Sequence, residues 1–292
     1  MADFSALLPP HWKEEVGRWI RDDCPSFDVG GLVVGDGETT ATLYAKSAGV
    51  LAGVPFFDAA FEVLGCQVTW MAKEGDALEP PQGGKLAIAT VRGPVRKVLL
   101  GERTALNTLS RASGVATASR KCVTLAKSHG WLGHVAGTRK TTPGFRVVEK
   151  YALFVGGAAT HRLDLSQMVM LKDNHVWSAG SITNAVNVAK SAAGFSSKIE
   201  VECRNLEEAF EAATAGADII MLDNYEPEAL KVDAKKIKAK FPHALVEASG
   251  GITFETLPLF FSPYVDIVSQ GALTQGYACV DFSLKLPQPA NN

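Results

Sequence analysis

The stretch KIEVECRNLEEAFEAATAGADIIMLDN (Lys198–Asn224) contains the pattern that decides the fold. Short apolar runs at its two ends stop at the acidic residues Glu202 and Asp223, and the segment between them has a helical pattern over Leu206–Ala215. A connection of this length joins two strands that run parallel to each other. The stretch therefore predicts one β-α-β unit with an acidic residue at the end of each strand.

The same unit recurs on both sides of this stretch, from Gly133 onward. Further strands are predicted at His134–Lys140, Met168–Asp173, Ala244–Gly250 and Val265–Gly271, and further helices at Thr183–Ala193, Pro227–Phe241 and Thr253–Phe261. The strands end on Lys140, Lys172, Glu202, Asp223, Ser249 and Gly271. In a β/α barrel such ends converge on one face, whereas in an open sheet they lie along an edge. The absence of a GxGxxG stretch after the first strand also favours a partial barrel over a dinucleotide-binding sheet.

The first hundred residues follow a different pattern. A helix is predicted around Trp12–Ile20, strands at Ala41–Lys46 and Lys85–Arg92, and a long helix at Val98–Lys127. Gly101 and Gly114 lie inside the last segment and leave open whether it is one unbroken helix. We expect an α/β protein with one domain over residues 1–115 and a barrel domain over residues 116–275, with residues 276–292 packed back on the first domain.

Composition excludes several classes of protein. The chain has 292 residues, of which 47% are hydrophobic and 21% charged, as in a globular protein with a full core. Its formal net charge of −2 offers no overall attraction to nucleic acid. No apolar run approaches the roughly 18 residues that a membrane span needs. We therefore expect neither a nucleic-acid partner nor a membrane.

The N-terminus and the cysteines indicate the cellular compartment. The stretch MADFSALLPPHWKEE lacks the basic and apolar regions of a secretory signal. The five cysteines are widely spaced and form no CxxC pair. We expect reduced thiols in a cytoplasmic protein and no structural zinc site. The cysteines are Cys24, Cys66, Cys122, Cys203 and Cys279.

Two short stretches supply cations close to the first predicted strand. In GTRKTTPGFR (Gly137–Arg146), Arg139 and Lys140 sit at the strand end, and the Pro-Gly pair forces a turn. A glycine-rich run then precedes His161 and Arg162. Cations held on a short loop suit a carboxylate or phosphate ligand, although a solvated basic loop would look the same.

Charged side chains also end the next three strands. Lys172 directly follows an apolar run, and Glu202 and Asp223 end the strands after it. The two carboxylates could act as acid and base, bind a divalent cation together with a phosphorylated substrate, or pair with Lys140 and Lys172. Neither a Ser-His-Asp arrangement nor an HExxH motif is present. The excess of cations predicts a polyanionic substrate or two anionic substrates.

The late strands and one earlier helix add the remaining candidates. Ser249–Gly251 and Gly271 follow the last two strands, where a β/α barrel commonly binds phosphate on closely approaching N–H groups. Arg103 lies in the long helix before the barrel. It either contacts Asn107 one turn away or reaches the site from another domain or subunit.

Taken together in chain order, seven motifs resemble the animal-type members of the quinolinate phosphoribosyltransferase (carboxylating nicotinate-nucleotide pyrophosphorylase) family. The motifs are GERTALN, HVAGTRKTTPGFR, GGAATHR, LKDNH, EVEC, MLDN and VEASGGI, and the resemblance extends from Ser47–Gly53 to Asp281–Leu286. It implies an N-terminal α/β sandwich, a partial α/β barrel, and transfer of 5-phosphoribosyl from phosphoribosyl pyrophosphate to quinolinate with loss of carbon dioxide.

The resemblance also implies roles for individual residues. Arg103 is expected to reach the site of a partner subunit, in a dimer or in a larger assembly such as a hexamer. The other quinolinate-binding residues implied are Arg139, Lys140, His161, Arg162 and Lys172. Glu202 and Asp223 are expected to face the ribose and Mg²⁺, and the phosphate-binding residues are Ser249, Gly250, Gly251 and Gly271. Lys140, Lys172, Glu202 and Asp223 form the expected catalytic set, with the lysines acting as charges.

Three alternative functions fit parts of this pattern. A sister enzyme that ribosylates nicotinate would release no carbon dioxide and would need fewer cations, because nicotinate has one carboxylate. A β/α-barrel aldolase would use Lys172 to form a Schiff base. A non-catalytic binding protein would have no reason to place charges at successive strand ends.

Overall fold

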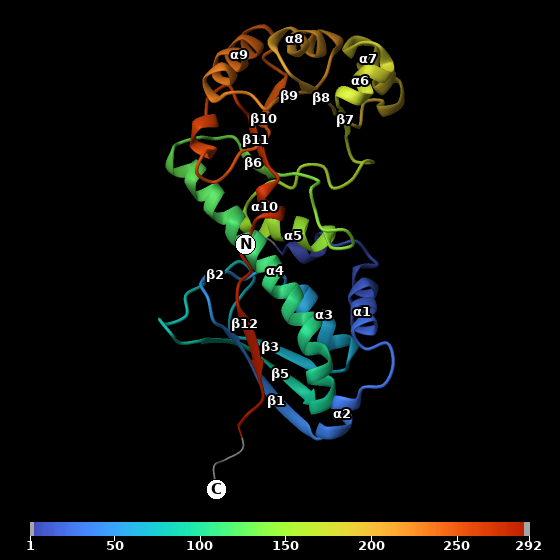
Figure 1. Ribbon diagram of the computed structural model, residues 1–292, viewed down its shortest axis with the longest axis vertical. Coiled ribbons are helices and arrows are strands. Elements are labelled where there is room, and N and C mark those ends of the chain that lie inside the picture. The colour runs from blue at the N-terminus through green and yellow to red at the C-terminus, as the bar shows by residue number, and fades with distance from the viewer. Residues whose placement is uncertain (1–2, 289–292) are drawn as a thin grey trace. The chain divides into compact units, whose positions relative to one another are not determined.

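The computed structural model describes residues 3–288, which form two compact units (Figure 1). The first unit contains residues 3–120, 142–157 and 277–288, and the second contains Lys121–Thr141 and Ala158–Gly276. Segment Thr142–Gly157 thus groups with the N-terminal part of the chain although it follows the first barrel strand. Within these residues, none of the helices has the length and apolar character needed to cross a bilayer.

The first unit is built on a four-stranded antiparallel sheet with the order β12-β1-β5-β3. Its strands are β1 (Glu38–Ala45), β3 (Gln67–Trp70), β5 (Leu86–Pro94) and β12 (Phe282–Lys285), and a two-stranded ribbon joins β2 (Gly49–Val50) to β4 (Ala77–Leu78). Strand β12 pairs with β1 through Thr42 and Lys285, so the C-terminal segment completes this sheet.

Helices pack on this sheet through aromatic side chains. Apart from the long helix that follows β5, the helices of the unit are η1 (Phe4–Leu7), α1 (Trp12–Asp23), α2 (Val29–Val34), α3 (Val54–Val63) and α5 (Arg146–Gly156). On α3, Phe57 is fully buried, and its ring lies 5.3 Å from the ring of Trp70 on β3. Phe56 on the same helix meets Tyr151 of α5 at 5.5 Å.

Helix α4 (Val95–Ser128) runs without a break through the two glycines that left its continuity open. A Cβ at Gly101 would lie 2.9 Å from Leu64, and a Cβ at Gly114 would lie 2.6 Å from the carbonyl oxygen of Ala278. Both glycines therefore allow close packing against the helix, which offsets their low helix propensity.

The second unit contains a six-stranded parallel sheet with the order β6-β11-β10-β9-β8-β7. The strands are β6 (His134–Gly137), β7 (Val169–Leu171), β8 (Ile199–Cys203), β9 (Ile219–Asp223), β10 (Leu245–Ser249) and β11 (Ile267–Gln270). From β7 to β11 each strand neighbours the next one in sequence, and β11 pairs back to β6. This is the strand order of a partial barrel, open between β6 and β7, and it confirms the predicted α/β fold class.

Three helices, α7 (Ile182–Ala193), α8 (Leu206–Ala215) and α9 (Pro227–Lys240), connect successive strands from β7 to β10. Each connection moves one strand further in the same direction, so right-handed crossovers place the three helices on the same side of the sheet (Figure 1). The opposite side is therefore left for the interior of the barrel.

Two local expectations were wrong. The segment predicted as a helix over Thr253–Phe261 contains only the short 3₁₀ helix η2 (Leu257–Phe260). Pro258 lies inside this segment and has no main-chain N–H to donate to the carbonyl of Phe254, so an α-helix cannot continue through it. Strand β6 ends at Gly137, so Arg139 and Lys140 lie in the following loop and not in the strand.

Candidate active site

A cavity of about 730 Å³ lies at the carboxyl ends of the parallel strands. Every candidate residue from the sequence except Arg103 lines it: Arg139, Lys140, His161, Arg162, Lys172, Glu202, Asp223, Ser249, Gly250, Gly251 and Gly271. Because parallel strands all end on one side, residues far apart in the sequence meet there. The structure thus places the candidate cations, carboxylates and glycine loop around one space, without assigning their roles.

Arg162 is the most buried of the arginines and lysines that line the pocket, with 9% of its surface exposed. Its guanidinium donates to the carbonyl oxygen of Met168 at 3.4 Å and approaches the sulfur of Met170 at 3.3 Å. Burial and the nearby charge of Arg139 lower its pKa, and the carboxylate of Glu200 acts in the opposite direction. Two guanidinium groups that repel each other across a cavity provide a site for an anion.

Lys140 is positioned by contacts with Gly271, which follows β11, and with the short helix α10 (Ala272–Gln275). Its carbonyl oxygen accepts a hydrogen bond from the hydroxyl of Thr274 at 2.8 Å. A Cβ on Gly271 would lie 2.9 Å from Cδ of Lys140, so the glycine leaves the space that the lysine side chain occupies. Gly271 therefore has a packing role in addition to its expected role at a phosphate.

Glu202 and Asp223 form the acidic side of the pocket, on the neighbouring strands β8 and β9. Glu202 is ion-paired with Lys172, one of the three possibilities that the sequence left open. Burial and then the charge of Glu202 raise the pKa of Asp223, while Lys172 and Lys140 act to lower it. The carboxylates of Glu202 and Asp223 repel each other, and a Mg²⁺ ion, which prefers carboxylate and water ligands, would relieve this repulsion.

The loop after β10 needs glycine for geometric reasons. Gly250 has φ +98° and Gly251 has φ +61°, in the region that side chains rarely adopt. A Cβ on Gly250 would lie 2.3 Å from Oδ1 of Asn224. Asn224 itself has φ +54° and donates from Nδ2 to Asp223 at 2.5 Å. The loop is thus tightly fitted to the acidic side of the pocket.

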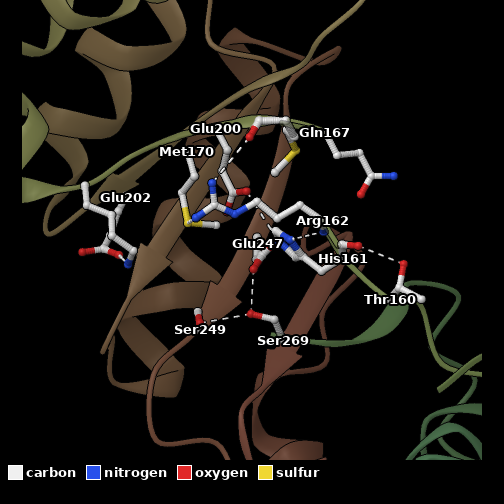
Figure 2. Close-up of polar contacts among 12 residues, drawn as sticks. Thr160, His161, Arg162, Gln167, Met170, Glu200, Glu202, Glu247, Ser249 and Ser269 are labelled. Carbon is white, nitrogen blue, oxygen red and sulfur yellow. Dashed lines mark hydrogen bonds and ion pairs between the residues drawn. The ribbon is translucent and has the colours of Figure 1, made fainter. Parts of the chain in front are cut away.

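Two carboxylates that the sequence reasoning missed lie beside His161 and Arg162 (Figure 2). Glu200 on β8 and Glu247 on β10 have no exposed surface. His161 Nε2 lies 3.1 Å from Glu247 and 3.4 Å from Glu200. Burial raises the pKa of Glu200, and its contact with His161 opposes that shift. The available signal was an acidic residue in the middle of each otherwise apolar strand, IEVEC and LVEAS.

Arg103 is the one candidate outside this pocket. It lies on α4 in the first unit and lines a different cavity of about 380 Å³, together with Trp19, Asn107 and Phe145. Its expected contribution to the site of a partner subunit stays a prediction.

Comparison with known proteins gives the same assignment along the whole chain. Residues 28–113 match the family model for the quinolinate phosphoribosyl transferase N-terminal domain, and residues 115–285 match the model for the C-terminal domain. The nicotinate-nucleotide pyrophosphorylase [carboxylating] of Homo sapiens is 55% identical over 281 residues, which cover 96% of this chain and 93% of the human protein. That of Dictyostelium discoideum is 48% identical and covers 97% of this chain and 99% of its own length.

A solved structure shows the corresponding fold. The crystal structure of NadC from Streptococcus pyogenes superposes with a TM-score of 0.86 at 36% sequence identity, over 98% of both chains. The matches to two family models, to relatives above 30% identity and to this structure cover both compact units. The chain belongs to the quinolinate phosphoribosyltransferase family.

Proposed function

We propose that the chain transfers the 5-phosphoribosyl group of phosphoribosyl pyrophosphate to the ring nitrogen of quinolinate, with decarboxylation. The products are nicotinate mononucleotide, pyrophosphate and carbon dioxide. The relatives at 55% identity carry the name of this reaction written in reverse, pyrophosphorolysis of nicotinate nucleotide with carboxylation. The observation that carries the proposal is a single cavity with cations on one side and carboxylates with a glycine loop on the other.

The cationic side of the pocket is suited to the diacid. Quinolinate carries two carboxylates on adjacent ring carbons, and Arg139, Arg162, Lys140 and Lys172 all line the same cavity. Fixed cations in a partly buried site bind a dianion more strongly than they would in water. Because both ring nitrogens of His161 are already engaged inside the protein, we assign the direct carboxylate contacts to the arginines and lysines.

The acidic side is suited to the sugar donor. As pyrophosphate leaves, the ribose carbon gains positive charge, and the fixed carboxylates of Glu202 and Asp223 can stabilise it. The same two residues would hold Mg²⁺, directly or through water, and the bound ion would neutralise part of the pyrophosphate charge. Gly250 and Gly251 line the same pocket, and we assign the binding of a phosphate to their main-chain N–H groups.

Decarboxylation requires no covalent bond to the protein. Once ribosylated, the ring nitrogen is cationic, so the electron pair left by carbon dioxide is stabilised on the adjacent carbon. This argues against the aldolase alternative, and the structure of the site adds a second argument. A Schiff base requires the lysine nitrogen to attack a carbonyl group, whereas the ammonium of Lys172 is ion-paired with the carboxylate of Glu202, a geometry suited to binding an anion.

The assembly is part of the same proposal. We propose a dimer as the minimal active unit, in which Arg103 of one subunit completes the quinolinate site of the other; larger assemblies would repeat this unit. An assay with quinolinate or nicotinate as acceptor, each with phosphoribosyl pyrophosphate and Mg²⁺, tests the function. Nicotinate mononucleotide should form from quinolinate and not from nicotinate. Faster formation from nicotinate would favour the sister enzyme.

A further inference from the structure

A series of hydrogen bonds connects Arg162 to Ser249, and all of its members line the pocket (Figure 2). The main-chain N–H of Arg162 donates to His161 Nδ1 at 2.8 Å, and His161 Nε2 lies 3.1 Å from Oε2 of Glu247. The hydroxyl of Ser269 donates to Oε1 of Glu247 at 2.6 Å and lies 3.0 Å from the hydroxyl of Ser249. We call this series the Glu247 chain.

The first hydrogen bond fixes the state of the imidazole. Nδ1 accepts from an N–H group, so its lone pair is occupied and the ring hydrogen of the neutral form sits on Nε2. Nε2–H then donates to Glu247. A ring in this form has no free lone pair for a metal, although His161, Glu200 and Glu247 lie close enough together to suggest one. It also has no donor left for a substrate.

Opposing influences act on the charge of this ring. Burial lowers the pKa of His161, but the hydrogen bonds and charges of Glu200 and Glu247 outweigh burial and raise it to about 9, which by itself would favour the charged ring at neutral pH. The N–H of Arg162 opposes protonation of Nδ1, because the hydrogen bond would become a contact between two N–H groups. The described geometry is therefore that of the neutral Nε2–H form, and this is directly testable.

The backbone at His161 requires support. His161 has φ +56°, and the only other described residue besides glycine with positive φ is Asn224, which also lines the pocket. This conformation is unfavourable for a residue with a side chain and persists only where surrounding contacts hold it. The contact to Glu247 holds the imidazole, and the imidazole in turn holds the N–H of Arg162.

Glu247 joins the two halves of the series. Glu247 is fully buried, and its two oxygens have different hydrogen-bond partners. Oε2 lies against Nε2 of His161, and Oε1 accepts from the hydroxyl of Ser269. We propose that Glu247 is a positioning residue that holds Arg162 on the quinolinate side and Ser249 on the phosphate side of the pocket. This inference rests on the proposed function and deepens it, since it assigns one buried carboxylate to both substrate sites.

The substitution Glu247→Met tests this with a side chain of similar size. Methionine has no oxygen acceptor, so the Nε2–H of His161 and the hydroxyl of Ser269 would both lose the partner that they have in Glu247. Losing a hydrogen bond to a charged group corresponds to roughly tenfold or more in an equilibrium constant. We expect KM to rise by about that factor for both quinolinate and phosphoribosyl pyrophosphate, with a smaller change in kcat.

Two further variants separate positioning from general stability. Ser269→Ala breaks only the phosphate arm of the Glu247 chain, so KM should rise for phosphoribosyl pyrophosphate and stay unchanged for quinolinate. Glu211→Met on α8 is the matched control outside the pocket; Glu211 also accepts hydrogen bonds, from Thr183. It should leave both KM values at those of the wild type.

The imidazole state is tested on the wild-type protein, which avoids any failure of a variant to fold. With ¹⁵N-labelled histidine, the His161 signal (assigned by its loss in His161→Asn) should show a hydrogen on Nε2 and none on Nδ1 near pH 7.5. A ring protonated on both nitrogens would overturn the hydrogen-bond assignment.

The outcomes for function and for positioning are distinct. If the wild type does not convert quinolinate, the proposed function fails. If the wild type converts it but folded Glu247→Met keeps both KM values within about twofold of Glu211→Met, the positioning role fails. If Ser269→Ala changes both KM values equally, the division into two arms is wrong.

Discussion

Lys172 and Glu202 form an ion pair across the neighbouring strands β7 and β8, at the wall of the pocket. Lys172 keeps 46% of its side chain exposed, whereas Glu202 keeps 15%. The ammonium group of Lys172 is therefore accessible from the pocket, and the carboxylate of Glu202 neutralises part of its positive charge. An ammonium held in this way is suited to binding an anion and poorly suited to nucleophilic attack.

Lys172 should consequently act as a charge. Replacing it with methionine removes the cation and leaves Glu202 unpaired, so kcat/KM for quinolinate should fall by roughly ten- to hundredfold or more. Lys172→Arg keeps the charge and should retain more activity. Borohydride added during turnover should leave the mass of the wild-type protein unchanged. A covalent quinolinate adduct on Lys172 would contradict this role.

Arg103 should act on a neighbouring subunit. Arg103→Ala and Lys172→Ala should each be poorly active alone, because loss of one partner in a charged contact is worth about 2–5 kcal/mol. Mixed oligomers of the two variants should regain activity, since some sites would combine an intact Arg103 with an intact Lys172. Absence of recovery, with subunit exchange verified by native mass spectrometry, would count against a role in trans.

The glycine loop should depend on the absence of a side chain at Gly250. Gly250→Ala would place Cβ against Asn224 and would also strain a residue with φ +98°. We expect KM for phosphoribosyl pyrophosphate to rise at least about tenfold, by analogy with 1–2 kcal/mol of left-handed strain. Gly180→Ala is the control, because its φ is +85° and its Cβ would meet open space. Equal kinetic effects of the two substitutions would show that strain alone, away from the pocket, explains the loss.

Glu74 should make the stability of the first unit depend on pH. Its two oxygens accept the N–H groups of Gly53 and Val54 at the start of α3. Burial raises the pKa of Glu74 to about 7, above the ordinary value near 4.5. Between those two values the folded protein binds more protons than the unfolded chain, so stability falls as pH rises, by at most about 3 kcal/mol.

Urea unfolding at pH 5 and at pH 7.5 measures this change. The wild type should lose more stability over the interval than Glu74→Gln, which has no proton to release there. Parallel losses in the two proteins would assign the pH dependence to other groups.

The sequence predicted the parallel strands, the connecting helices α7 to α9 and the residues around the pocket. The reason is that each strand is apolar along its length and polar at its end, a local pattern that one chain displays directly. Lys172, Glu202 and Asp223 were found in this way. The roles expected for them come from the family resemblance and stay predictions until the variants are measured.

Features that depend on contacts between distant segments escaped the sequence analysis. An acidic residue inside an apolar strand was a signal for Glu200 and Glu247, but only the folded barrel shows that both are fully buried beside His161. The 3₁₀ helix in place of a longer helix is a different case, because Pro258 inside the predicted segment is a local signal against a continuous α-helix. Helix α5 was missed although its buried residues Val148, Tyr151, Ala152 and Val155 recur at helical spacing.

The most direct test of the central claim is the fate of one carbon atom. Quinolinate labelled in the carboxylate next to the ring nitrogen is incubated with the protein, phosphoribosyl pyrophosphate and Mg²⁺, and released carbon dioxide and nicotinate mononucleotide are measured together. We expect one labelled carbon dioxide for each mononucleotide formed, and none without phosphoribosyl pyrophosphate. A nucleotide that retains the label, or no release at all by the folded protein, would contradict decarboxylating phosphoribosyl transfer.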